Sequence, residues 1–238
     1  NGYGLTTIGT SALPLGSMAS SICGLTWFWF LALYMRETRQ LPQRAISVQL
    51  WDWSLVLLLI ACAGAVGLVV MVFTGSESIL LQLLFLHLFL DLFAAGWFAL
   101  AILGLLWDLF GDDLSGGGLS GNVRLPVMTL ALALVPTFVL GMLPSIVPPG
   151  LATLGLIANA IAAVLFGWHF VYLWPHRRQL TWFGRFGLVM FGLYILGALV
   201  LSLPSVWRWA AGTQLRVYYL HLFLLGWISS IVLDLLLQ

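Results

Sequence analysis

Residues 53–73 read WSLVLLLIACAGAVGLVVMVF, an apolar run without a charged side chain. A helix rises about 1.5 Å per residue, so about 20 apolar residues span the hydrocarbon core of a bilayer. The run also lacks the polar face of a helix that lies on the surface of a soluble domain. We therefore interpret it as a transmembrane helix, and much of the remaining sequence repeats its character.

The composition of the whole chain supports the same interpretation. Of its 238 residues, 62% are hydrophobic and 7% are charged, whereas a soluble domain carries about 25% charged residues. This excludes a soluble enzyme, a secreted disulfide scaffold and a disordered tail. The net charge of +1 provides no basic surface for nucleic acid. The chain also contains no lysine, which excludes a retinal Schiff base.

Seven apolar segments are long enough to cross a bilayer. They lie near 14–35, 53–73, 79–107, 125–147, 151–174, 183–204 and 215–237. Charged, glycine-rich or proline-rich stretches separate them. We predict an all-α integral membrane protein, with a seven-transmembrane-helix bundle that forms a single domain over residues 1–238. Because the chain begins with Asn1 and not with methionine, we also expect further residues upstream.

The positions of the arginines predict the orientation of the bundle, since loops rich in arginine stay in the cytoplasm. Arg208 and Arg216 lie in one set of loops. The opposite set holds Arg36, Arg39, Arg44, Arg124, Arg177, Arg178 and Arg185. We therefore expect a multi-pass protein whose N-terminus is outside and whose C-terminus is cytoplasmic.

Five other residues have predicted structural roles. Pro136 and Pro204 are expected to kink or end the fourth and sixth spans, because proline disrupts a helix interior. Asn159 is expected to form a hydrogen bond between helices. We interpret His169 as a residue of the membrane interface, and we expect Asp234 to reach the lipid headgroups from the inner end of the last span.

The third and seventh spans share a sequence pattern. Residues 86–90 and 220–224 share the block Leu-His-Leu-Phe-Leu, and Gly96-Trp97 and Gly226-Trp227 follow. The distance to Gly-Trp differs between the two spans by about one helical turn. Both spans run from outside to inside on the arginine argument. We therefore predict a parallel repeat that relates the third span to the seventh.

The repeat suggests a cofactor site. His87 and His221 each lie about 9–12 Å below the outer end of their span. We predict that they face one another and bind heme b, or a copper or iron ion. Asp91 lies one turn after His87 on the same helix face. It is predicted to orient His87, to complete a metal-ligand set with His87 and His221, or to transfer protons.

The segments around these histidines resemble a known family. Residues 86–105, which contain His87 and Gly96-Trp97, and residues 218–227, which contain His221, are similar to small bacterial membrane proteins distantly related to heme-copper oxidase subunit I, including NnrS-type proteins. The resemblance implies a helical bundle in the bacterial inner (plasma) membrane, with His87 and His221 as ligands of a heme or copper centre. The chain lacks the adjacent histidine pair of an oxidase core. We therefore do not expect it to reduce oxygen or to be catalytic on its own.

Three functions remain open at this point. The first is a heme- or metal-binding subunit that acts in electron transfer in a respiratory chain, in metal handling or in redox sensing. The second is a structural or accessory subunit without a cofactor of its own, whose partners are the lipid bilayer and other membrane subunits or further copies of the chain. The third is a transporter, which is less favoured because few polar residues lie near the midplane.

Overall fold

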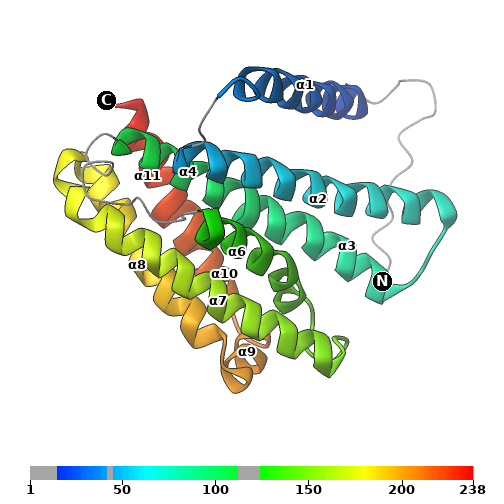
Figure 1. Cartoon of the computed structure of the whole chain (residues 1–238). Coiled ribbons are helices and arrows are strands. Elements are labelled where there is room, and N and C mark those ends of the chain that lie inside the picture. Colours follow the sequence, from blue (N-terminus) through cyan, green and yellow to red (C-terminus); the bar gives the residue numbers. More distant parts are fainter. Residues whose placement is uncertain (1–14, 42–44, 112–123, 238) are drawn as a thin grey trace. The chain divides into compact units, whose positions relative to one another are not determined.

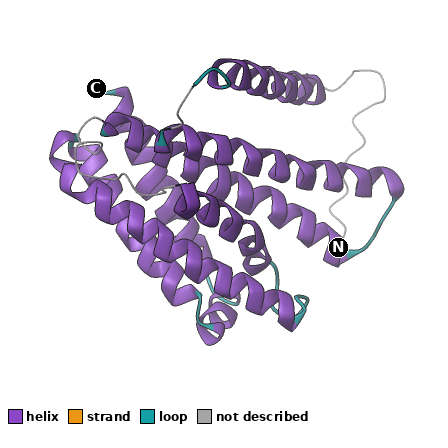
Figure 2. Ribbon diagram, viewed as in Figure 1, coloured by secondary structure: helices purple, strands orange, loops and turns teal. Residues whose placement is uncertain are grey.

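The computed structural model describes residues 15–41, 45–111 and 124–237. Throughout these ranges, helices are the only regular secondary structure (Figure 2). The chain divides into two compact units, residues 1–43 and 44–238. The first unit contributes helix α1 (Leu15–Thr38), and all other described helices belong to the second. The prediction of a single domain over residues 1–238 stays a prediction.

The second unit is a bundle of helices (Figure 1). Its α-helices are α2 (Ile46–Thr74), α3 (Ile79–Asp91), α4 (Ala99–Leu109), α6 (Arg124–Leu134), α7 (Pro149–Leu173), α8 (Trp182–Leu201), α9 (Pro204–Ala211), α10 (Leu215–His221) and α11 (Ser229–Leu236). Two π-helical segments, η1 (Leu92–Phe98) and η4 (Leu222–Ile228), join α3 to α4 and α10 to α11. Two 3₁₀ helices, η2 (Val135–Gly141) and η3 (Trp174–Gln179), extend α6 and α7.

Five helices of the described chain are long and apolar enough to cross a membrane. They are Ile46–Thr74, Ile79–Leu109, Pro149–Gln179, Trp182–Leu201 and Leu215–Leu236. They coincide with five of the predicted spans, and the all-α membrane fold is confirmed at this level. The predicted count of seven is not confirmed, because α1 is not among the five and the helix over 125–141 is shorter.

Proline explains why the fourth predicted span is short. Pro136 has no backbone N–H to donate, and its ring clashes with a preceding carbonyl in an α-helix. Accordingly, α6 ends at Leu134 and the chain continues as the 3₁₀ helix η2. Pro204 follows the end of α8 and begins α9, a position where a missing N–H is harmless. The predicted effects of both prolines are confirmed.

Large aromatic side chains fill the core of the second unit. Trp227, Phe166 and Phe191 are almost completely buried, and the rings of Trp227 and Phe191 stack with their centroids 4.0 Å apart. The outward faces are apolar as well, since Val72 and Phe73 on α2 are 81% and 86% exposed. Apolar side chains on both the inner and the outer face of a helix fit a lipid environment, because lipid tails and not water contact the outer face.

A polar side chain of α7 connects two helices of the bundle. The Asn159 side-chain N–H₂ donates to the Ala198 carbonyl at 2.7 Å and to the Ser202 hydroxyl at 2.9 Å. These contacts satisfy a polar group that would otherwise lie unbonded in an apolar interior. They confirm the predicted helix–helix hydrogen bond of Asn159.

Asp234 is fully buried, so the prediction that it reaches the lipid headgroups is wrong. Its Oδ1 accepts the backbone N–H groups of Thr181 and Gly184 at 2.8 and 3.1 Å, and also the Thr181 hydroxyl. Thr181 directly precedes α8. The first N–H groups of a helix have no partner within it and favour a negative charge. Asp234 of α11 therefore caps the N-terminus of α8 and connects the two helices.

His169 is also buried, whereas the sequence predicted a residue at the membrane interface. Its side chain is 1% exposed, and the Trp107 indole N–H donates to its Nδ1 at 2.9 Å. An indole nitrogen only donates, so this Nδ1 acts as the acceptor. The hydrogen bond pairs two polar groups inside the core and connects α4 to α7.

Candidate functional site

The second unit contains a cavity of about 570 Å³. It is lined by residues of α3, η1, α10 and η4, with contributions from η2, α7, α8 and α9. Its walls are mainly aliphatic and aromatic side chains. Small-molecule sites in proteins measure about 300–1,000 Å³ and combine apolar walls with a few polar groups. The cavity therefore has the size and character of a ligand site.

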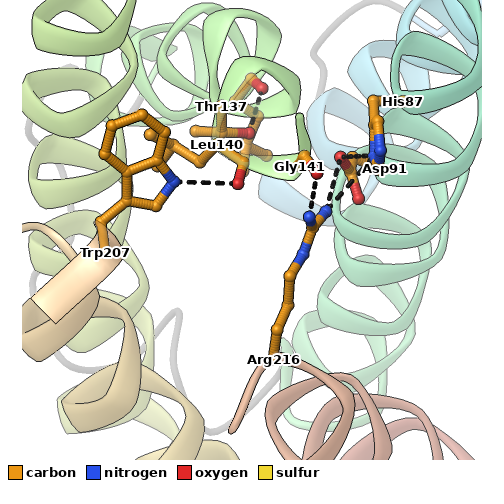
Figure 3. Close-up of polar contacts among 8 residues, drawn as sticks. His87, Asp91, Thr137, Leu140, Gly141, Trp207 and Arg216 are labelled. Carbon is orange, nitrogen blue, oxygen red and sulfur yellow. Dashed lines mark hydrogen bonds and ion pairs between the residues drawn. The ribbon is translucent and has the colours of Figure 1, made fainter. Parts of the chain in front are cut away.

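Three polar side chains that line this cavity contact one another, as Figure 3 shows. The Nδ1 atom of His87 lies 3.2 Å from Asp91 Oδ2 and 3.3 Å from the Nη2 atom of Arg216. Arg216 Nη2 lies 3.8 Å from Asp91 Oδ2. His87 and Asp91 belong to α3, and Arg216 belongs to α10. We call these residues the polar cluster; it connects α3 to α10.

Local helix geometry and helix ends position the cluster. His87 and Asp91 are four residues apart, which places both on one face of α3. Arg216 lies in the first turn of α10, and its Nη1 donates to the carbonyl of Gly141. Gly141 is the last residue of η2, and carbonyls at a helix C-terminus favour a cationic donor. The Arg216 guanidinium therefore contacts η2 and also the other two members of the polar cluster, His87 and Asp91.

A second hydrogen bond holds the same end of η2. The Trp207 indole N–H of α9 donates to the carbonyl of Leu140 at 3.0 Å (Figure 3). Trp207 is buried, and together with Ala210 and Ala211 it lines the cavity. Helix α9 and the C-terminal end of η2 therefore form one connected part of the cavity wall.

The imidazole of His87 can interact with its neighbours in two ways. Asp91 in its ionised form only accepts hydrogen bonds, and the Arg216 guanidinium only donates them. If Nδ1 of His87 carries the proton, it donates to Asp91 and the Nε2 atom keeps its lone pair. If Nε2 carries the proton, Nδ1 accepts from Arg216. The cluster thus contains both donors and acceptors.

His221 lies apart from the cluster. Its side chain is exposed, and its Nδ1 donates to the carbonyl of Val217 on its own helix at 2.7 Å. The described residues that line the cavity include His87 and Asp91 but not His221. Nor does the described part of the chain contain a group of three His, Cys, Asp or Glu side chains that would hold a metal ion. A heme bound by His87 and His221 together, or a metal bound by these two and Asp91, gains no support from this arrangement.

The π-helical segments show why the two histidines differ. Segment η1 reads LFAAGWF and η4 reads LFLLGWI, so Leu-Phe and Gly-Trp occupy matching positions within seven residues. In this register Asp91 and His221 match, since each directly precedes its π-helical segment, and His87 matches Val217. Aligning the histidines, as the sequence pattern suggested, displaces the two helices by about one turn.

Matching residues of the two segments line the same cavity. Leu90 and Leu220 do so, as do Phe93 and Phe223. The cavity therefore lies between two segments of similar sequence and similar backbone, and the His87–Asp91 pair is present on one side only. The asymmetry becomes apparent only in the π-helical register, which the block around the two histidines does not follow.

Arg216 is the site residue that the sequence analysis missed. It was interpreted only as a loop arginine that helps to set the orientation. A signal was available, since Arg216 stands at the start of an apolar span, where a buried cation requires a partner. The sequence does not identify Asp91 as that partner, because Asp91 in α3 and Arg216 in α10 are far apart in the chain.

Comparisons of the chain with protein-family models, with curated proteins and with solved structures find no match. The resemblance to relatives of heme-copper oxidase subunit I stays a prediction based on the short motifs around His87 and His221.

Proposed function

We propose that this chain is a multi-pass membrane protein that binds an amphiphile from the bilayer in the cavity between α3–η1 and α10–η4. One observation carries the proposal: His87, Asp91 and Arg216 converge on a cavity whose other walls are largely apolar. An amphiphile matches both features, because its tail contacts the apolar walls and its head group forms hydrogen bonds with the cluster.

The exposure of three lining residues supports a ligand that arrives through the lipid. Elsewhere in the cavity wall, Trp207 of α9 and Arg216 are bonded to the last residues of η2. Leu90, Val217 and Leu220 line the cavity and are also 47%, 47% and 44% exposed. These side chains therefore form a rim between α3 and α10, on the apolar outer surface of the bundle. In the predicted orientation this rim lies in the outer leaflet.

Filling the cavity tests the proposal. Ala94 lines the cavity, and the matching residue in η4 is Leu224, so Ala94→Leu adds a side chain that this backbone already carries elsewhere. Ala63 on α2 is exposed, which makes Ala63→Leu the matched control. The purified protein is stripped of lipid, incubated with an extract of membrane lipids, washed and analysed by mass spectrometry.

We expect the wild type and Ala63→Leu to retain about one amphiphile per chain and Ala94→Leu to retain at least tenfold less. Ala94→Phe provides a larger filling side chain, and thermal unfolding shows whether each variant is folded. Equal retention by the wild type and both folded Ala94 variants would overturn the proposal.

Heme bound by His87 alone is the second candidate, and the contact between His87 and Asp91 favours it. A carboxylate bonded to one ring nitrogen commonly orients a histidine whose other nitrogen binds a metal. Arg216 is a cation that can pair with the carboxylates of a heme. Bound heme would supply electron transfer, as the resemblance implies. A structural or accessory role in a larger complex stays a prediction.

Absorbance spectroscopy separates heme from other amphiphiles. Protein produced with added heme should show a Soret band that disappears in His87→Ala and persists in His221→Ala. If the wild type shows no Soret band, heme is rejected and the proposal of an uncoloured amphiphile stands.

A further inference from the structure

We infer that the cavity selects amphiphiles whose head group is uncharged and both donates and accepts hydrogen bonds. A diacylglycerol and a long-chain isoprenoid alcohol share this chemistry through their hydroxyl groups. The inference rests on the proposed function and deepens it by specifying the head group. It follows from the charge balance, the accessibility and the remaining hydrogen-bonding capacity of the polar cluster.

The charges of Arg216 and Asp91 offset each other, with 3.8 Å between Nη2 and Oδ2. Among the described residues that line the cavity, Arg216 is the one arginine and Asp91 the one carboxylate. An additional charge in an apolar site has no partner and is energetically unfavourable. An anionic head group would leave the pair and ligand at net −1, and a cationic one at net +1. An uncharged head group preserves the balance.

The cluster is accessible from the cavity. The side chains of Asp91 and Arg216 are 28% and 37% exposed, and both residues line the cavity. A sealed ion pair would serve only to connect α3 with α10. These side chains instead present polar atoms to any molecule that occupies the cavity.

Asp91 and Arg216 can each form further hydrogen bonds. The contacts of Asp91 with His87 and Arg216 both use Oδ2, which leaves Oδ1 to accept from a ligand hydroxyl. The guanidinium has five N–H donors, more than its contacts with Gly141, His87 and Asp91 require. A hydroxyl group that donates to Asp91 and accepts from Arg216 matches both.

Two lipids with identical chains test the inference. The purified, delipidated chain in an uncharged detergent is titrated with dioctanoylglycerol and with dioctanoylphosphatidic acid, and binding is followed by isothermal titration calorimetry. We expect dioctanoylglycerol to bind at least tenfold more tightly. Farnesol has the hydroxyl group without ester carbonyls and distinguishes the two sources: comparable binding of farnesol assigns the recognition to the hydroxyl group, and weaker binding assigns it to the glycerol ester.

Charge variants provide the decisive comparison. Asp91→Asn retains the size of the side chain and leaves the Arg216 charge without its partner, so it should shift the preference at least tenfold toward dioctanoylphosphatidic acid. The double variant Asp91→Asn/Arg216→Gln is uncharged and should restore the preference for dioctanoylglycerol. Asp108→Asn, at an exposed carboxylate of α4, is the matched control and should bind like the wild type.

Two results have different meanings for the two proposals. If the wild type binds dioctanoylphosphatidic acid as tightly as dioctanoylglycerol, or if folded Asp91→Asn shows no shift in preference, the head-group inference is overturned while the proposed function stands. If the folded wild type binds neither lipid nor farnesol and also retains no amphiphile from the membrane extract, both proposals fail.

Discussion

The two π-helical segments η1 and η4 share a sequence pattern and differ in what surrounds it. Before η1, Asp91 lies in a polar cluster at the wall of a cavity. Before η4, His221 is exposed and bonded to its own helix. π-Helical segments are rare and often occur at functional sites. The comparison shows that one type of backbone supports a candidate binding site on one side of the cavity and mainly packing on the other.

At one pair of matching positions toward the C-terminal ends of these helices, the helix that contains η4 carries the acidic residue, and the helix that contains η1 does not. Counted from the π-helical segments, Gly104 of α4 matches Asp234 of α11. Gly104 lies directly against Trp51 of α2, whereas the Asp234 carboxylate binds the start of α8. Asp91 and Asp234 therefore each lack an acidic counterpart at the matching position of the other helix. Asp91 lines a cavity, which fits its proposed role in binding; Asp234 is buried and bonded to the start of α8, which indicates a role in stability.

The largest expected effect comes from Asp234. Its replacement by alanine leaves the N–H groups of Thr181 and Gly184 without their acceptor. An unsatisfied buried group costs about 1–3 kcal/mol, so Asp234→Ala should lower the free energy of unfolding by about 3 kcal/mol. Unfolding in mixed detergent micelles measures the change. Asp108→Ala, at an exposed carboxylate, should change it by less than about 0.5 kcal/mol. Equal effects of the two substitutions would refute the structural role of Asp234.

The glycines of the two segments should differ in their tolerance of a methyl group. A Cβ at Gly96, which is buried, would lie 3.0 Å from the Cβ of Leu57; one at Gly226, which is partly buried, would lie 3.0 Å from the Cγ and 3.1 Å from the Cβ of Met190. The nearest atom at Gly96 is a Cβ held by the backbone, whereas the nearest atom at Gly226 belongs to the adaptable part of a methionine side chain. Gly96→Ala should therefore lower the unfolding free energy by about 2 kcal/mol and Gly226→Ala by less than about 1 kcal/mol.

Thermal unfolding of both variants in the same detergent checks this prediction. A greater loss for Gly226→Ala would show that the two segments are not packed in the way that the comparison requires. Gly150→Ala is the matched control, since a Cβ at Gly150 meets no atom within 4 Å.

Much of the fold could be predicted from the sequence, because hydropathy determines which segments cross a bilayer. The predicted span 79–107 corresponds to the helix Ile79–Leu109, and the predicted span 215–237 to Leu215–Leu236. The shortening at 125–141 could only be foreseen in part. Pro136 indicated a break in the fourth span, but whether the chain continues as an α-helix or a 3₁₀ helix depends on the tertiary contacts around it.

The site was predicted only in part, because the spacing of residues along the sequence predicts contacts within one helix but not contacts between distant helices. His87 and Asp91 were recognised as neighbours, since a separation of four residues places them on one helix face. The position of Arg216 beside them depends on tertiary contacts, among them the hydrogen bond from its guanidinium to Gly141 of η2. The sequence pattern matched His221 with His87, and their similar distances from the outer ends of the spans predicted a common level. The π-helical segments instead match His221 with Asp91.

The histidines provide a test at the level of binding. His87 lies in the polar cluster and His221 does not. His87→Ala should weaken binding of the amphiphile about tenfold, equivalent to about 1.4 kcal/mol. His221→Ala should change the affinity less than about twofold, within the range of a substitution outside the site. Titration of both variants with the amphiphile identified in the wild type measures the difference. Similar losses in both variants would restore the pairing predicted from the sequence.

The smallest expected effect concerns the end of η4. The Ser229 hydroxyl donates to the Leu224 carbonyl at 2.8 Å, five residues earlier, while the matching residue after η1 is Ala99, which has no hydroxyl. Ser229→Ala should lower the unfolding free energy by only about 0.5–1 kcal/mol, the usual contribution of one hydrogen bond. Ser230→Ala, whose bond to Leu225 is 3.5 Å long, should lower it less.

Hydrogen exchange of the η4 amides in Ser229→Ala distinguishes two origins of the π-helical backbone. Because η1 forms without such a hydroxyl, we expect η4 to keep its protection from exchange and the helix pair to remain in register. Loss of protection confined to residues 222–228 would mean that the serine, and not the shared Leu-Phe and Gly-Trp positions, determines the π-helical turn in this copy. The π-helical backbones of the two segments would then have different causes. The shared positions would no longer justify the register that matches Asp91 with His221.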